Sequence, residues 1–153
     1  MNTRMVLCAL PLLVVGFSSA SSMQAQAKPA KPVLPAAVAK AFHETYPAAR
    51  ILAFSREREK GRTIYEVESR DGTTRRDLLY SPTGEVIEIE ETIALAALPL
   101  PVRNALETAA PGAKVSRAER VTRDSVVTYE FAVRVSGRAR AFNFDSAGRP
   151  VKP

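Results

Sequence analysis

Hydrophobic positions beyond residue 33 first follow a helical spacing and then an alternating one, and this order occurs twice. An apolar stripe at three- and four-residue intervals covers residues 34–45, and a second covers residues 98–109. Each stripe runs up to a proline, Pro47 or Pro111. Because proline disfavours the helical conformation in the residue before it, both helices are expected to end there.

Alternating apolar and polar residues follow each stripe and predict antiparallel strands. Tight turns at Asp71-Gly72 and Ser136-Gly137 separate the second and third strands. The predicted strands cover residues 49–58, 63–70 and 74–80 in the first copy and 113–123, 126–135 and 138–144 in the second, each with a fourth strand after a further turn. The side chains expected to face the helices are Tyr65, Val67, Leu78, Tyr80, Ile87 and Ile89, and then Tyr129, Phe131, Val133, Phe142, Phe144 and Val151.

The two segments are related by a constant offset of 64 residues without a gap. The pairs that match at this offset include Pro35/Pro99, Val38/Val102, Pro47/Pro111, Tyr65/Tyr129, Glu66/Glu130 and Gly84/Gly148. The sequence therefore predicts an α+β fold of two tandem repeats, residues 34–91 and 98–153. In each, a helix packs on a four-stranded antiparallel meander sheet.

A single copy is too small to be stable alone, since a domain of about 60 residues buries only about 60% of its unfolded surface. The copies are therefore expected to associate, edge to edge or through their helices, into one cooperative unit. The linker, residues 91–97, is short and apolar. It is expected to lie against the protein, with Ile93 and Leu95 contributing to the joint.

Residues 1–27 have the pattern of a secretory signal peptide. Arg4 supplies the positive charge, residues 6–17 are apolar, and Ala25-Gln26-Ala27 matches a cleavage site. The apolar run is too short to span a bilayer. We expect cleavage after about Ala27, a periplasmic or secreted protein with no transmembrane segment, and a short extended leader over residues 28–33.

The formal net charge of +6 is unevenly distributed. Residues 28–91 contain 11 basic and 11 acidic residues, whereas residues 98–153 contain 10 basic and 5 acidic residues. For an exported protein, this excess points away from nucleic acid and towards anionic lipid, an envelope polymer or an acidic protein surface.

Several of these residues resemble a known sequence motif. Tyr65, Val67, Asp71-Gly72, Leu78 and Gly84 resemble the PepSY motif, and residues 111–115 resemble the helix-to-strand junction of the same family. The tandem arrangement, over residues 34–152, is similar to the PepSY-like proteins grouped with the β-lactamase inhibitor protein. This resemblance implies exported, non-enzymatic modules, some of which bind and inhibit peptidases or β-lactamases. No inhibitory loop matches, so no contact residue is carried over.

The residues that carry chemistry in enzymes and metalloproteins are sparse. His43 is the single histidine, and Cys8, the single cysteine, lies in the signal segment. Ser81 and Ser146 lie in predicted turns, which account for them. We therefore expect a protein that is not an enzyme and that has no catalytic residues, cofactor or metal. The acidic run Glu85, Glu88, Glu90 and Glu91 could bind a cation, but its alternation favours the solvated face of a strand.

A charged pattern recurs in both copies, because Arg56, Glu66 and Arg70 return as Arg120, Glu130 and Arg134. A hairpin closed around residues 60–61 is expected to place Arg56 opposite Glu66, and Arg120 opposite Glu130. Such pairs are either structural, which we favour, or part of a ligand-facing ridge. The candidate binding residues on the outward face are Arg56, Glu66, Arg75, Leu79, Arg120, Glu130 and Arg134. An apolar patch of Ile64, Leu79, Leu52 and Phe54 is expected beside them.

Three function hypotheses follow. The first is an exported module that binds a protein partner in the cell envelope, as an inhibitor or regulator of a peptidase or another protein. The alternative is a binder of an anionic small ligand, lipid or polymer through the basic second copy, residues 98–153. The third, an enzyme, lacks a catalytic set.

Overall fold

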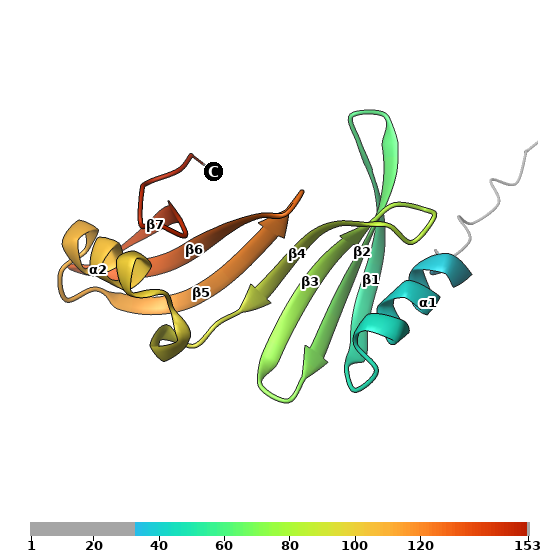
Figure 1. Cartoon of the computed structure of the whole chain (residues 1–153), viewed down its shortest axis with the longest axis horizontal. Coiled ribbons are helices and arrows are strands. Elements are labelled where there is room, and N and C mark those ends of the chain that lie inside the picture. The colour runs from blue at the N-terminus through green and yellow to red at the C-terminus, as the bar shows by residue number, and fades with distance from the viewer. Residues whose placement is uncertain (1–32, 153) are drawn as a thin grey trace, which may run out of the picture. The chain divides into compact units, whose positions relative to one another are not determined.

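The computed structural model describes residues 33–152, which form one antiparallel sheet of seven strands with two helices (Figure 1). The strands pair in the order in which they occur in the chain. The elements are α1 (Ala36–Thr45), β1 (Arg50–Glu59), β2 (Arg62–Asp71), β3 (Thr74–Tyr80), β4 (Val86–Thr92), the 3-10 helix η1 (Leu95–Ala97), α2 (Leu100–Ala109), β5 (Lys114–Arg123), β6 (Val126–Val135) and β7 (Arg138–Asp145). The predicted signal peptide and all of the predicted leader except Val33 lie outside the described residues.

Both predicted helices are confirmed, and they begin and end in the same way. Pro35 and Pro99 precede the first helical residue of α1 and α2. Tyr46 and Ala110 close the last turns by donating their backbone N–H groups to Phe42 and Leu106. Proline follows each of these capping residues. It prevents a further turn because it disfavours the helical conformation before it and has no N–H group to donate.

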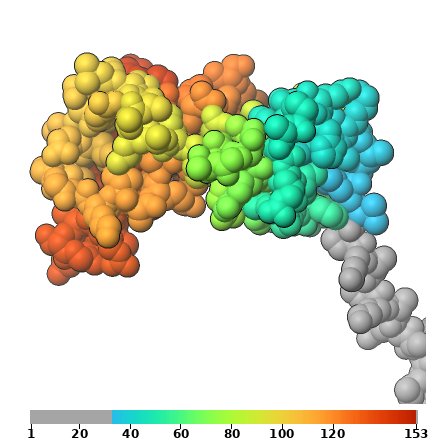
Figure 2. All heavy atoms as spheres, turned by 90° about the horizontal axis from the view of Figure 1, so that it is seen from below, coloured from blue at the N-terminus to red at the C-terminus, as the bar shows by residue number. Residues whose placement is uncertain are grey.

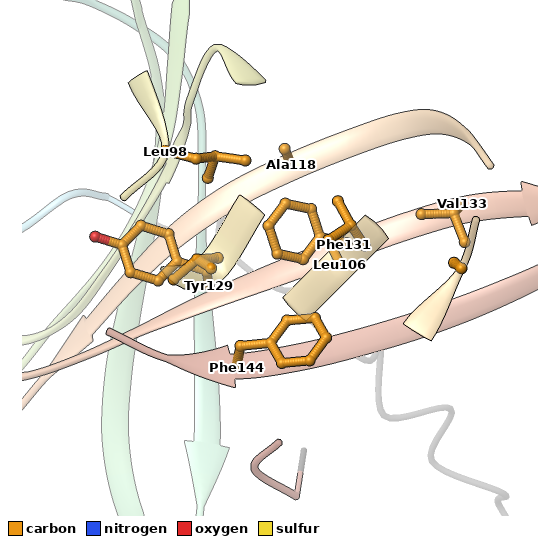
Figure 3. Close-up of a cluster of buried hydrophobic side chains, with 9 residues drawn as sticks. Leu98, Leu106, Ala118, Tyr129, Phe131, Val133 and Phe144 are labelled. Atoms are coloured by element: carbon orange, nitrogen blue, oxygen red, sulfur yellow. The ribbon is translucent and has the colours of Figure 1, made fainter. Parts of the chain in front are cut away.

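Each helix packs over the strands of its own copy and forms a separate hydrophobic cluster. The first cluster consists of Val38, Phe42, Ala49, Val67, Leu78 and Tyr80. The second, drawn in Figure 3 between α2 and the strands β5–β7, consists of Leu98, Val102, Leu106, Ala110, Ala118, Tyr129, Phe131, Val133 and Phe144. The predicted core is therefore confirmed except at two positions. Ile87 lies at a register shift between β3 and β4 and belongs to neither cluster, and Val151 lines a hollow on the other side of the sheet.

The two helices cover the same face of the continuous sheet. Directly opposed residues of an antiparallel pair point to the same side. One row of opposed residues runs across four strands from Leu78 in the first cluster, through Ile89 and Thr122, to Val127 beside the second cluster. The opposite side of the sheet carries no helix, and we call it the helix-free face.

The copies are joined edge to edge, which is one of the two expected arrangements, whereas the prediction of a fourth strand is wrong for the second copy. Strand β4 pairs with β3 on one side and with β5 on the other, so the copies share one sheet, joined edge to edge. The second copy has three strands, because its last segment forms only an isolated bridge between Phe144 and Pro150. Proline has no N–H group for the ladder, and this segment makes only the single bridge, whose two bonds run from the N–H of Val151 to Asn143 and from the N–H of Asp145 to Arg149.

The linker lies against the protein only in part. Ile93 packs against the second cluster and donates its N–H to the carbonyl of Ala118, as predicted. Leu95 is 45% exposed at the start of η1, so its predicted role in the joint is wrong. Figure 2 shows this part of the chain in yellow, against the orange residues of the second copy.

A bulge of one residue occurs at the same place in both copies. The register shifts between Ile51 and Ala53 in β1 and between Val115 and Arg117 in β5. An extra residue in a strand reverses the side to which all residues on its far side point. Phe54 therefore packs in the first hydrophobic cluster, and its predicted place in an outward apolar patch is wrong.

Candidate binding surface

Alternation along the strands gathers carboxylates on the helix-free face. In each strand, the apolar residues that face the helices alternate with residues that point to the opposite side of the sheet. Ten of the latter are acidic: Glu57, Glu59, Glu66, Glu68, Asp77, Glu88, Glu90, Glu119, Glu130 and Asp145. They come from all seven strands. Carboxylates therefore gather on the helix-free face although the chain as a whole is basic.

A hollow of about 230 Å³ lies over β1–β4 on this face, and we call it the acidic hollow. Its lining consists of Glu57, Glu66, Asp77, Leu79, Glu88 and Glu90. Of its five carboxylates, only Glu88 has an ion-pair partner among residues 33–152, the guanidinium of Arg123. Ser55 donates its hydroxyl hydrogen bond to Glu66, over 3.3 Å between the oxygens. The acidic hollow thus holds more negative charge than neighbouring cations offset.

A second hollow of about 380 Å³ adjoins it over β4–β7, and we call it the mixed hollow. It shares Glu88 and Glu90 with the acidic hollow, and its other lining residues include Val121, Val126, Thr128, Glu130, Asn143, Val151 and Lys152. Val126 is 63% exposed, an unusually open position for a large apolar side chain. The helix-free face therefore offers an acidic and a partly apolar depression side by side.

The carboxylates of this face affect one another's protonation. Burial raises the pKa of Glu90 to about 7, helped by the negative charges of Glu88, Glu119 and Glu130. Burial also raises the pKa of Asp77, and the charge of Glu68 acts in the same direction. The charge of the face therefore depends on pH near neutrality.

We expect Glu90→Gln to stabilise the protein at pH 8 but not at pH 4. The folded pKa of Glu90 lies above the ordinary value of 4.5, so the folded chain holds this proton more tightly than the unfolded chain does. The stability that this tighter proton binding contributes is present at low pH and is lost as the pH rises through about 7. Glutamine cannot ionise, so Glu90→Gln avoids this loss. The expected gain in the free energy of unfolding at pH 8 is on the order of 1 kcal/mol, discounted for the partial solvent exposure of this residue.

Urea unfolding at the two pH values measures this difference. Glu85→Gln, at an exposed residue just before the same strand, is the control and should give the same difference from wild type at both. A Glu90→Gln effect that does not change with pH would contradict the expected ionisation.

The two predicted Arg–Glu pairs do not form. Arg56 lies opposite Tyr65, and Arg120 lies opposite Tyr129, one residue away from the predicted register. The reason is the turn: Lys60 and Gly61 both have positive φ, which closes a two-residue hairpin with Glu59 opposite Arg62. Arg56 and Arg120 therefore belong to the helix-bearing face, and the predicted ridge of charges is divided between two faces.

The other predicted binding residues lie on the helix-free face. Glu66 and Leu79 line the acidic hollow, and Glu130 lines the mixed hollow. Arg75 lies near Glu68, with 3.8 Å between Nη2 and Oε2, and Arg134 donates to the carbonyl of Gly137. Their role in binding stays a prediction. Ile64, placed in the predicted apolar patch, is 7% exposed.

Four residues of the acidic hollow are not among the predicted binding residues: Glu57, Asp77, Glu88 and Glu90. Alternation already indicates the outward side for Asp77, Glu88 and Glu90, and it places Glu57 there too once its pairing with Ile64 is known. The expectation that the run from Glu85 to Glu91 forms a solvated face is wrong for Glu88, which is 5% exposed. Glu91 points to the helix-bearing face, where it accepts from Arg76 over 3.0 Å and contacts Arg120.

The arginines of β5, and the arginine of the last turn, are engaged by carboxylates. Arg117 lies 3.3 Å from Glu119, and Arg149 lies 2.6 Å from Asp145. Arg120 and Arg123 pair with the first copy. The hypothesis of an anionic ligand on the second copy stays a prediction, and loss of binding to anionic vesicles at high salt would test it.

The side chains considered for catalysis include His43 and Ser81, and both make contacts within the fold. His43 is exposed on α1, with its ring edge-on to Phe42 at 5.3 Å between centroids. Ser81 accepts from the backbone N–H groups of Thr83 and Glu85 and so stabilises the turn before β4. Within residues 33–152, no three histidine, cysteine or acidic side chains are arranged to hold a metal ion. In the same part of the chain, neither helix is long and apolar enough to cross a membrane.

Comparison with known proteins decides the family. The model of the family described as "Putative beta-lactamase-inhibitor-like, PepSY-like" matches residues 24–88 and again residues 65–149. The chain belongs to this family. Its two overlapping matches together cover most of the chain, so the resemblance inferred from the motif is confirmed. No curated protein matches the sequence.

Solved structures of the same fold come from Bacteroides species. A protein from Bacteroides eggerthii, titled a putative periplasmic protein, is similar with a TM-score of 0.65 and 16% identity, over 79% of this chain and 88% of that one. A BLIP-like protein from Bacteroides fragilis has a TM-score of 0.61 and 15% identity, over 79% and 86%. A DUF2874 family protein from Bacteroides uniformis has a TM-score of 0.64 and 15% identity, over 77% and 86%. At these identities the likeness shows the fold alone.

Proposed function

We propose that this protein is an exported, non-enzymatic binding module that recognises a protein partner of the cell envelope through its helix-free face. The observation that carries the proposal is the asymmetry of the sheet. One face is covered by α1 and α2, whereas the other carries two adjoining hollows with a combined lining of acidic, polar and apolar side chains. Concave surfaces with mixed linings are typical of protein recognition sites.

Family and neighbours support the class of partner. The family is named for its likeness to a β-lactamase inhibitor, and the Bacteroides fragilis neighbour is called BLIP-like. The Bacteroides eggerthii neighbour is called periplasmic, which agrees with the signal-peptide pattern of residues 1–27. We propose that the partner is an envelope peptidase or another protein whose activity this module inhibits or regulates.

Affinity capture with a matched pair of variants tests the proposal. Val126 and Leu100 are both exposed branched apolar residues, at 63% and 65%, but Val126 lines the mixed hollow and Leu100 begins α2. Residues 28–153, immobilised and incubated with envelope extract, should recover a partner. Val126→Asp should reduce recovery at least fivefold, and Leu100→Asp should leave it unchanged. Recovery that is insensitive to Val126→Asp but lost with Leu100→Asp would place the interface elsewhere and contradict the proposal.

A further inference from the structure

We infer that the acidic hollow receives a lysine or arginine side chain from an extended segment of the protein partner. This inference rests on the proposed function and specifies the chemistry of the partner. The hollow lies on an unpartnered sheet face and has five carboxylates, from β1, β2, β3 and β4, around a single apolar residue, Leu79. Four of these carboxylates, all but that of Glu88, have no ion pair among residues 33–152.

The shape of the lining favours a long cationic side chain over a metal ion. Neighbouring strands are about 4.8 Å apart, so carboxylates on four strands form a row rather than a cage. In the described part of the chain they do not converge as a metal-binding group. A lysine or arginine can place its aliphatic stem on Leu79 while its charged end reaches a carboxylate. The planar guanidinium can also bind two carboxylate oxygens at once.

The protein itself provides an example of this recognition. Glu88 lines both hollows, and its side chain is only 6% exposed. Its carboxylate is paired with the guanidinium of Arg123, whose side chain is 65% exposed and reaches in from β5. One wall of the hollow therefore already binds a guanidinium that approaches from the solvent. The remaining carboxylates, on the side away from Arg123, offer the same chemistry to a second cation.

Binding should strengthen as the pH rises from 6 to 8. Glu90 faces Asp77 from β3, Glu88 on its own strand, Glu119 from β5 and Glu130 from β6, with the cations Arg75, Arg117 and Arg123 nearby. Its pKa of about 7 means that it gains its charge within this range. An added negative charge attracts a cation more strongly, whereas the neutral form at pH 6 attracts it less.

Titration with defined peptides tests the inference. The probes are the acetylated, amidated peptides Thr-Val-Arg-Val-Thr and Thr-Val-Gln-Val-Thr, added to ¹⁵N-labelled residues 28–153 and followed by NMR. The arginine peptide should shift the amides around Glu57, Glu66, Leu79 and Glu90 and bind at least fivefold more tightly than the glutamine peptide. Its affinity should rise severalfold from pH 6 to pH 8, and Glu90→Gln should remove most of that rise.

Two double variants separate the hollow from general charge. Glu57→Gln with Glu66→Gln should weaken the arginine peptide at least fivefold, while the exposed helical pair Glu44→Gln with Glu107→Gln should have no effect. Equal binding of the two peptides, or equal effects of the two double variants, would overturn the inference. The same amide shifts with calcium chloride alone would also overturn it, in favour of an inorganic cation. If Val126→Asp still abolishes capture of a partner while the peptides bind equally, the proposed function stands and only the cationic partner is rejected.

Discussion

Replacing Gly148 with alanine is expected to destabilise the protein by about 2–4 kcal/mol. Gly148 lies in the turn after β7 with φ +79°, a conformation that costs an alanine about 1 kcal/mol or more. A Cβ atom at this position would lie 2.5 Å from the carbonyl oxygen of Pro101 in the first turn of α2. The obstacle is backbone, so relief requires the turn or the helix to move, at about 1–3 kcal/mol more.

A second glycine provides the control for this prediction. Gly137, in the turn between β6 and β7, has the same φ of +79°, but a Cβ atom added there would have no atom within 4 Å. Gly137→Ala should therefore show only the backbone cost, about 1 kcal/mol. The measurement is the free energy of unfolding in urea for both variants. Equal losses would show that the close approach of the turn to α2 does not matter for stability.

The first copy repeats this contact. Gly84, in the turn before β4, would place a Cβ atom 2.6 Å from the carbonyl oxygen of Ala37 in α1. The residue 64 positions before Asp145 is Ser81, and both use a side-chain oxygen to accept backbone N–H groups of the turn. Packing therefore explains why glycine recurs at this position: in each copy the turn lies directly on the first turn of the helix, where a side chain would not fit.

Neither half of the protein is expected to fold alone, whereas residues 28–153 should unfold in one transition. Strand β4 pairs with β5 over residues 88–92 and 119–123. Glu91 accepts from Arg76 of the first copy and contacts Arg120 of the second. Separation would expose both strand edges, and each half is of a size that buries only about 60% of its unfolded surface. Continuous pairing supports the proposal that the copies form one cooperative unit.

Circular dichroism of residues 28–95 and 96–153 tests this expectation. Both fragments should give spectra of largely unfolded chains, and the intact protein should show a single denaturant transition. Arg76→Lys, which keeps the charge but removes the guanidinium's contact with Glu91 and with the ring of Tyr46, should weaken the intact protein without dividing its transition. Two resolved transitions, or a fragment that melts sharply, would show that the copies are independent.

The features that the sequence predicted correctly depend on short-range patterns. The 3.6-residue spacing of Val38 and Phe42, and of Val102 and Leu106, is sufficient to define the buried side of each helix. The strands follow from alternation and from glycine turns. The duplication helped, because each feature of one copy could be checked against the other.

The errors arise where a single residue changes the parity of a strand. The bulge after Ile51 reverses the side of Phe54, and the two-residue turn at Lys60-Gly61 shifts Arg56 away from Glu66. The hydrophobic pattern does not specify either, because a bulge or a turn type depends on backbone conformation at one or two residues.

The burial of Glu88 depends on a long-range pairing that no local pattern encodes. Glu88 is buried because Arg123, from the other copy, lies opposite it across the joint between β4 and β5. The sequence left open whether the copies meet by edges or by helices. The ion pair between Glu88 and Arg123 therefore could not be derived before the strand order was known.

Site-specific photo-crosslinking in the native envelope tests the central claim most directly. Ala53 and Ala141 are exposed alanines on the helix-free face, in β1 and β7, and Ala36 is an exposed alanine at the start of α1. A photoreactive amino acid placed at Ala53 or Ala141 should crosslink to the same partner protein, and one placed at Ala36 should not. Crosslinks from Ala36 alone, or none from the two positions on the sheet, would contradict recognition through the helix-free face.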